Sequence, residues 1–114
     1  MRKAIPLLAT FGVLAACSGA KTERPHTPDA KVGQQVAQDI CAGCHAVGTT
    51  GDSPTPSAPI FRTLLARYDK ANLRQNLQDA THISHPRMPQ VFMSDAHIED
   101  LIAYLESIQV EPQL

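Results

Sequence analysis

Apolar residues recur at helical spacing in four stretches of the chain, separated by polar segments that carry proline or glycine. The first pattern is spaced i, i+4, i+5, i+8 and consists of Val32, Val36, Ala37 and Ile40. This spacing predicts a helix that begins near Ala30, with these four residues on its core face. Asp29 stands directly before it and can cap its first turn through its carboxylate. The helix continues into a pair of cysteines.

Two shorter patterns follow in the middle of the chain. Residues 60–68 read as a helix, and its core face is drawn from Phe61, Leu64, Leu65 and Tyr68. Asp69 can cap a third, short helix that carries Leu73 and Leu77. Both patterns are short, so we expect small helices here.

The last pattern is the strongest in the chain. Ser94 is placed to cap it, and Asp95 in its first turn faces the positive end of the helix dipole. The apolar stripe consists of Ile98, Leu101, Ile102, Leu105 and Ile108. Pro112 ends the pattern.

Residues 48–59 and 80–93 show no helical or strand period and are expected to be loops. No stretch alternates as a strand does. The sequence therefore predicts an all-α domain with short central helices and long loops, and long loops in a small domain usually serve a function.

The front of the chain has the build of an export signal. Arg2 and Lys3 precede a nearly uncharged apolar run over residues 4–16, too short to span a bilayer. The run ends in small residues before Cys17, which resembles the lipobox of bacterial lipoproteins and implies a lipid on that thiol. Ordinary cleavage that leaves a thiol, or an uncleaved anchor, are the alternatives. We expect a signal peptide at 1–16, a flexible lipid-anchored tether at 17–29, a folded domain at 30–110 and a tail at 111–114.

Export and charge limit the functions that remain. The chain of 114 residues has ten basic and eleven acidic side chains, and removal of residues 1–16 leaves eight basic ones, a net charge of about −3. That balance argues against a nucleic-acid partner, which needs a clustered basic face. A folded part this small gains from a covalent cofactor. The export signal also predicts where the protein is located, namely the periplasmic side of a bacterial membrane.

One motif indicates a covalently bound cofactor. It is Cys41-Ala42-Gly43-Cys44-His45, the C-x-x-C-H pattern of haem c attachment. Two thiols on one turn can reach the two vinyl groups of one porphyrin edge, and the next histidine can reach the iron. Zinc would need another pair of thiols, and a thioredoxin-like site would need strands around it. The motif therefore predicts one haem c, held by Cys41 and Cys44 with His45 on the iron.

The iron then needs a sixth ligand or an open position. The candidates downstream are His82, His85, Met88, Met93 and His97. Met88 is the first choice because Pro86 and Pro89 keep its segment out of a helix and stiffen it around a weak thioether ligand. Met93 is the second choice, since packing is the commoner role of a methionine beside a helix. His85 is the third.

In order and spacing, residues 30–109 resemble a class I bacterial cytochrome c. The features that carry the resemblance are Gly33, the C-x-x-C-H motif, Pro59-Ile60-Phe61, Met88-Pro89 and Leu101-Ile102-Ala103-Tyr104. The resemblance implies that the first and last helices cross beside the haem, with Gly33 allowing Leu101 or Tyr104 to approach.

Further roles come from the same resemblance. It implies that the carbonyl of Pro59 accepts a proton from Nδ1 of His45. The central region is brief compared with longer members of the family, and the side chains offered for the haem propionates are Tyr68, Arg62 and Arg67.

With a histidine and a methionine on the iron there is no place for a substrate, so we expect an electron carrier, not an enzyme. Its partners would be redox proteins such as respiratory complexes or oxidases, met at the membrane to which the lipid anchor holds it. Three alternatives remain. One is a haem-based gas sensor or small peroxidase-like enzyme with an open sixth site. The others are a haem-free lipoprotein with a Cys41–Cys44 disulfide or thiol site, and the cytochrome subunit of a larger oxidoreductase.

Overall fold

The computed structural model describes residues 12, 19, 24–79 and 88–111, and these contain helices and loops but no strand. The elements in chain order are α1 (Ala30–Val36), a π-helical turn η1 (Ala37–Cys41), a 3₁₀ helix η2 (Phe61–Ala66), α2 (Lys70–Gln78) and α3 (Asp95–Ile108). The expected all-α architecture is confirmed.

Each α-helix begins at the capping residue that the sequence offers. The carboxylate of Asp29 accepts from the backbone N–H of Lys31 at 2.8 Å, and that of Asp69 accepts from Ala71 at 3.0 Å. The Ser94 hydroxyl accepts from His97 N–H at 3.2 Å. These bonds satisfy donors that a helix leaves free at its start, which fixes where the three helices begin.

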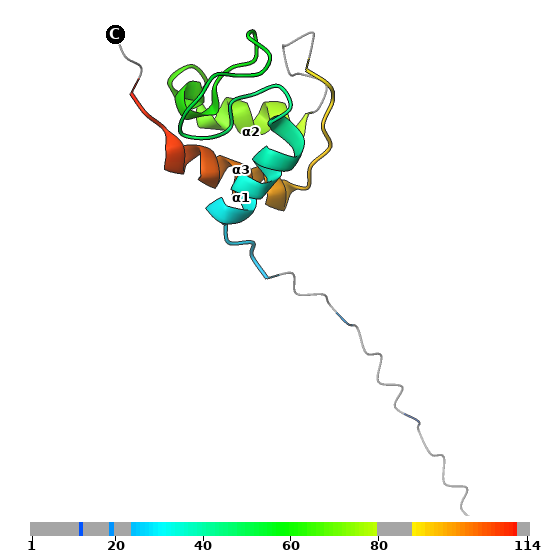
Figure 1. The fold of residues 1–114 in the computed structure, drawn as a ribbon. Helices are drawn as coiled ribbons and strands as arrows, with labels where there is room; N and C mark the ends of the chain where they lie inside the picture. Colours follow the sequence, from blue (N-terminus) through cyan, green and yellow to red (C-terminus); the bar gives the residue numbers. More distant parts are fainter. Residues whose placement is uncertain (1–11, 13–18, 20–23, 80–87, 112–114) are drawn as a thin grey trace, which may run out of the picture.

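Helices α1 and α3 cross in close contact, as Figure 1 shows. The closest approach is at Gly33, where an added Cβ would lie 1.9 Å from the carbonyl oxygen of Asp100 and 2.8 Å from Cβ of Tyr104. Only a residue without a side chain allows the two backbones to come so near. The helix crossing and the part of Gly33 in it agree with the expectation.

The core lies between α3 and the elements that pack on it. Its buried members include Ala37, Phe61, Leu64, Leu101, Tyr104, Leu105 and Ile108. The Gln109 side chain closes the end of α3 against η2: its amide donates to the carbonyls of Phe61 and Leu105 at 2.8 and 2.9 Å, and its oxygen accepts from Leu65 N–H at 3.1 Å.

The predicted core face of the first helix is partly wrong. Val36 and Ala37 are buried, but Val32 is 39% exposed and Ile40 is 42% exposed. The contact with α3 is centred on Gly33, which turns Val32 away from the core. Beyond Val36 the helix widens into a π turn, closed by Ala42 N–H donating to the Ala37 carbonyl at 3.0 Å. A count at 3.6 residues per turn therefore misplaces Ile40.

The second predicted helix is shorter and tighter than expected. It is a 3₁₀ helix over Phe61–Ala66, not an α-helix over residues 60–68. Phe61 and Leu64 are buried as predicted, but Tyr68 is 43% exposed and does not belong to the core face. Tyr68 lies one turn beyond Leu64, and its N–H donates to the Leu64 carbonyl at 3.0 Å, but it follows the end of the 3₁₀ helix and is not buried with Phe61 and Leu64.

Candidate haem site

The cysteine motif forms a compact turn at the end of the π-helical segment η1. The backbone N–H groups of Cys44 and His45 both donate to the carbonyl of Cys41, at 3.2 and 2.9 Å. Cys41 is partly buried, Cys44 is exposed, and both thiols are free of a disulfide. Burial raises the pKa of the Cys41 thiol to about 11, so in the chain without haem it is a neutral thiol near pH 7. The turn thus brings both thiols and the histidine together at the end of this helix.

His45 is held in one orientation by two contacts. Its Nδ1 lies 2.7 Å from the carbonyl oxygen of Pro59. The family resemblance implied this pairing of His45 with Pro59. Its ring also meets the Phe61 ring at a centroid distance of 5.1 Å and a tilt of 50°. The carbonyl can only accept, so Nδ1 carries the proton and Nε2 is left as the nitrogen available to a metal.

A cavity of about 230 Å³ opens directly beside the motif. Cys41, Cys44 and His45 line one part of it, together with Pro59. Most of the remaining wall is apolar and comes from Ile40, Phe61, Leu64, Leu73, Leu77, Val91, Leu101 and Leu105. No Asp, Glu, Lys or Arg is among the described residues that line it. A thiol pair, an oriented imidazole and an apolar wall are the surroundings that a covalently bound haem requires.

The structure brings two of the five candidate iron ligands to this cavity. Met88 and Met93 both line it, and Met93 also packs against the core. His97 lies exposed on α3 and does not line it. His82 and His85 lie outside the described residues.

Of the three side chains offered for the propionates, only Tyr68 lines the cavity. Arg62 instead donates to the carbonyl of Gly51 at 2.8 Å, and Arg67 is exposed at the end of η2. Cys17, the expected lipid site, lies outside the described residues.

Two polar residues of the cavity were not anticipated, Thr55 and Asn76. For Asn76 a signal was present, because it stands three residues after Leu73 and one before Leu77, on the same face of α2. A polar amide in this apolar stripe could therefore have marked Asn76 as a residue of the cavity. Thr55 lies in a loop without periodicity, where the sequence offers no comparable signal.

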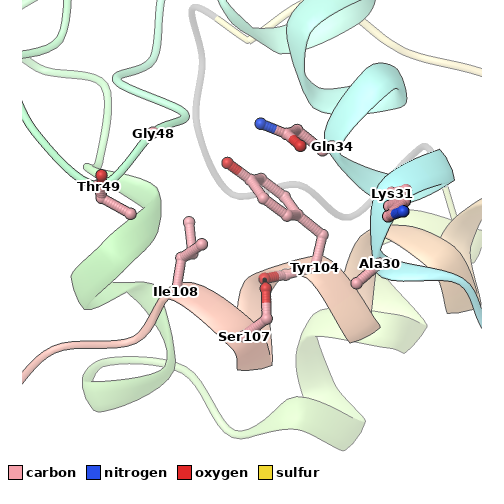
Figure 2. Close-up of a pocket in the computed structure, with 8 residues that line it drawn as sticks. All are labelled: Ala30, Lys31, Gln34, Gly48, Thr49, Tyr104, Ser107 and Ile108. Atoms are coloured by element: carbon pink, nitrogen blue, oxygen red, sulfur yellow. Dashed lines mark hydrogen bonds between the residues drawn. The ribbon is translucent and has the colours of Figure 1, made fainter.

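A second hollow, of about 400 Å³, shares no described lining residue with this cavity and is drawn in Figure 2. It is bounded by the start of α1, the loop at Gly48 and Thr49, and the end of α3. Tyr104 projects beside it and donates its hydroxyl to the carbonyl of Val47 at 2.7 Å, and burial raises the pKa of this phenol. No residue of the cysteine motif lines this hollow, so it is not the cofactor site.

Two other features, a metal-ion site and a membrane-spanning helix, are not found among the described residues. There, no group of three or more His, Cys, Asp or Glu side chains is arranged to hold a metal ion. A zinc site therefore lacks a ligand set among these residues. No helix within the same ranges has the length and apolar character needed to cross a membrane.

A helical domain whose free thiols, oriented histidine and thioethers share one cavity has the features of a haem-binding domain. Comparison with known proteins agrees: the chain matches the family model "Cytochrome c" over residues 30–109 and belongs to that family. It therefore carries covalently bound haem c and functions in haem-based electron transfer.

One curated relative is "Cytochrome c oxidase subunit 2" of Alkalihalophilus pseudofirmus. It is 34% identical over 99 residues, which cover 80% of this chain and 29% of the relative. The chain thus corresponds to less than a third of that protein. No solved structure matches this chain.

Proposed function

We propose that the protein is a one-electron carrier, not an enzyme, whose haem is bonded to Cys41 and Cys44 and ligated by His45 and Met88. The observation that carries the proposal is the 2.7 Å contact between Nδ1 of His45 and the Pro59 carbonyl, beside a cavity that Met88 also lines. When bound, the haem supplies one iron that alternates between the ferrous and ferric states.

The residues around the site have separate tasks in this proposal. The Pro59 carbonyl holds the proton on Nδ1 of His45, which leaves Nε2 free as a ligand and increases its donor strength. The thioether of Met88 favours the ferrous state and so raises the reduction potential. The uncharged wall excludes water, so that little rearranges when the electron moves.

The rim of the cavity is where electrons would enter and leave. Ile40 and Tyr68 line the cavity and are 42% and 43% exposed. Phe92, 84% exposed, does not itself line the cavity but stands in the chain between two residues that do, Val91 and Met93. Apolar side chains at such a rim suit brief encounters with a redox partner, where close approach matters more than affinity.

The named relative supports an oxidase as the electron acceptor. It is an oxidase subunit by its name, and this chain resembles part of it. We propose that the carrier works on the periplasmic side of a bacterial membrane, anchored by a lipid on Cys17, and exchanges electrons with respiratory complexes or oxidases. A permanent place as a cytochrome subunit of such a complex is the alternative that this relative favours.

Absorption spectra of the haem-loaded protein and of two methionine variants test the ligands. Met88→Ala should remove the weak long-wavelength band of sulfur-to-ferric-iron charge transfer, lower the midpoint potential and allow carbon monoxide to bind. Met93→Ala, the matched control, should keep the band. The opposite result would assign the sulfur ligand to Met93, and a wild-type protein without the band would refute methionine ligation.

A further inference from the structure

Asp100 is a buried carboxylate that lies at the crossing of α1 and α3. It is 2% exposed, although it belongs to a charged residue type that is rarely buried without partners. One of its oxygens, Oδ1, accepts two hydrogen bonds, from Nε2 of His26 and from the backbone N–H of Asp29, both at 2.7 Å. Both donors come from the segment that precedes α1.

These contacts fasten the N-terminal segment to the C-terminal helix. His26 and Asp100 are 74 positions apart in the sequence, and Asp29 is the same residue whose side chain caps α1. The carbonyl of Asp29 also accepts from Gly33 N–H at 2.9 Å. The segment is therefore joined both to the first turn of α1 and to α3, at the point where the two helices are closest.

The position of this attachment relative to the cofactor is fixed by one continuous helical rod. Residues 30–41 run from the attachment to Cys41: α1 spans roughly 10 Å at 1.5 Å per residue, and the π-helical turn continues from it to Cys41. Figure 1 shows residues 24–29 leaving the domain at the α1 end of this rod. The thiols that take the haem lie at its other end.

We propose that His26 and Asp100 form a clip that fixes the direction in which the N-terminal tether leaves the domain. If a lipid holds that tether, as proposed above, the clip shortens its free part to the residues before His26 and so limits the orientations that the haem can take relative to the membrane. His26 is then a positioning residue. It does not touch the cofactor, but it narrows the range of directions in which the cavity rim of the anchored protein can face.

The clip itself is tested in the ferrous holoprotein by NMR, without any membrane. We expect heteronuclear NOE values at the amides of Arg24, His26 and Thr27 as high as those of α1, and slow hydrogen exchange at the Asp29 amide; the two intervening residues are prolines and have no amide proton. His26→Ala should lower those NOE values to the level of a free tail and speed that exchange about tenfold, since one anchoring hydrogen bond is lost. His97→Ala, a change at an exposed histidine on α3, should do neither.

His26→Gln separates the hydrogen bond from the ring, because its amide can still donate to the carboxylate; it should restore part of the order. Residues 24–28 that are mobile in the wild type, or that stay ordered in His26→Ala, would overturn the clip. The haem spectrum and midpoint potential should be the same in all variants, since none of the changes reaches the cavity.

The orienting role is tested by linear dichroism of the haem band in aligned bilayers. The wild type should show dichroism of the haem band, and His26→Ala should reduce it several-fold at equal loading. Equal dichroism in both proteins would overturn the orienting role. Failure of the wild type to bind the bilayer would instead refute the lipid anchor, while the NMR result on the clip would stand.

Discussion

Gly33→Ala should destabilise the domain through a clash that neither neighbour can avoid. The new Cβ would lie 1.9 Å from the carbonyl oxygen of Asp100 and 2.4 Å from its carbonyl carbon. Ordinary contact begins at 3.4 Å, so the shortest approach is too close by about 1.5 Å. Both atoms belong to the backbone of α3. A side-chain rotation therefore cannot relieve the clash, and the helices must move apart.

The expected cost follows from two opposing terms. Overpacking of a core costs about 1–3 kcal/mol and occasionally more, and a clash with backbone belongs at the upper end, about 3 kcal/mol. Alanine in a helix is favoured over glycine by about 1 kcal/mol. The net loss is then about 2 kcal/mol, which corresponds to a melting temperature lower by roughly 8–16 °C in a domain of this size.

Thermal unfolding of the haem-loaded protein, followed by circular dichroism at 222 nm, measures this loss. Gly48→Ala is the matched control, because a Cβ at Gly48 meets nothing within 4 Å. It should melt within a few degrees of the wild type. A Gly33→Ala protein that melts with this control would show that the helices do not depend on the close approach.

Three further changes test other parts of the structure. Tyr104→Phe removes the hydrogen bond to the Val47 carbonyl and should cost about 1 kcal/mol in urea unfolding. Burial raises the pKa of the Tyr104 phenol, so the stability it contributes is complete below the ordinary pKa of about 10 and is lost as pH rises through the native value. This variant should therefore lose less stability at alkaline pH; an equal loss would refute the assignment. Phe92→Lys should slow electron self-exchange, measured by NMR on mixed ferrous and ferric protein, several-fold. Val110→Lys, the same charge change at an exposed apolar residue outside the segment 88–93 that contributes to the cavity, should not, and equal rates would exclude Phe92 from the contact. Gln109→Ala removes three hydrogen bonds and should cost about 2 kcal/mol in the same urea assay; a loss below 0.5 kcal/mol would show that they add little.

The parts of the fold that depend on local chemistry could be predicted from the sequence. Asp29, Asp69 and Ser94 were each identified as caps, and all three helices begin where expected, because capping needs only one side chain and the next turn. The apolar stripe of α3 is buried at Ile98 and Leu101 as its spacing predicts. Long, regular patterns of this kind leave few alternatives.

The parts that depend on contacts between distant residues could not be predicted in the same way. Nothing in the local pattern distinguishes a π turn at Ala37–Cys41 from an α-helical one. The partner of His26 is 74 positions away, so no spacing rule could connect it with Asp100. The pairing of His45 with Pro59 was foreseen only through the family resemblance, since a proline carbonyl in a loop has no sequence pattern of its own.

The choice of a sulfur ligand shows the same limit at the site. Stiffness of the chain favours Met88, but Met93 lines the same cavity. Sequence reasoning could rank the two by the prolines around them. It could not judge their distances to a common point, which depend on how residues 88–94 run from the cavity to α3.

The wide turn at Ala37–Cys41 has a consequence for insertions and deletions in this helix. A π turn accommodates one extra residue locally, and the helix on either side keeps its facing. Removing one residue inside the turn can thus restore an ordinary helix without rotating the cysteines relative to Gly33. The α-helical segment Ala30–Val36 has no extra residue to lose. Removing one residue there would rotate the residues that follow, relative to those before, by about 100°. The turn is therefore the place where this helix can change length while the glycine contact and the haem-bearing thiols stay aligned.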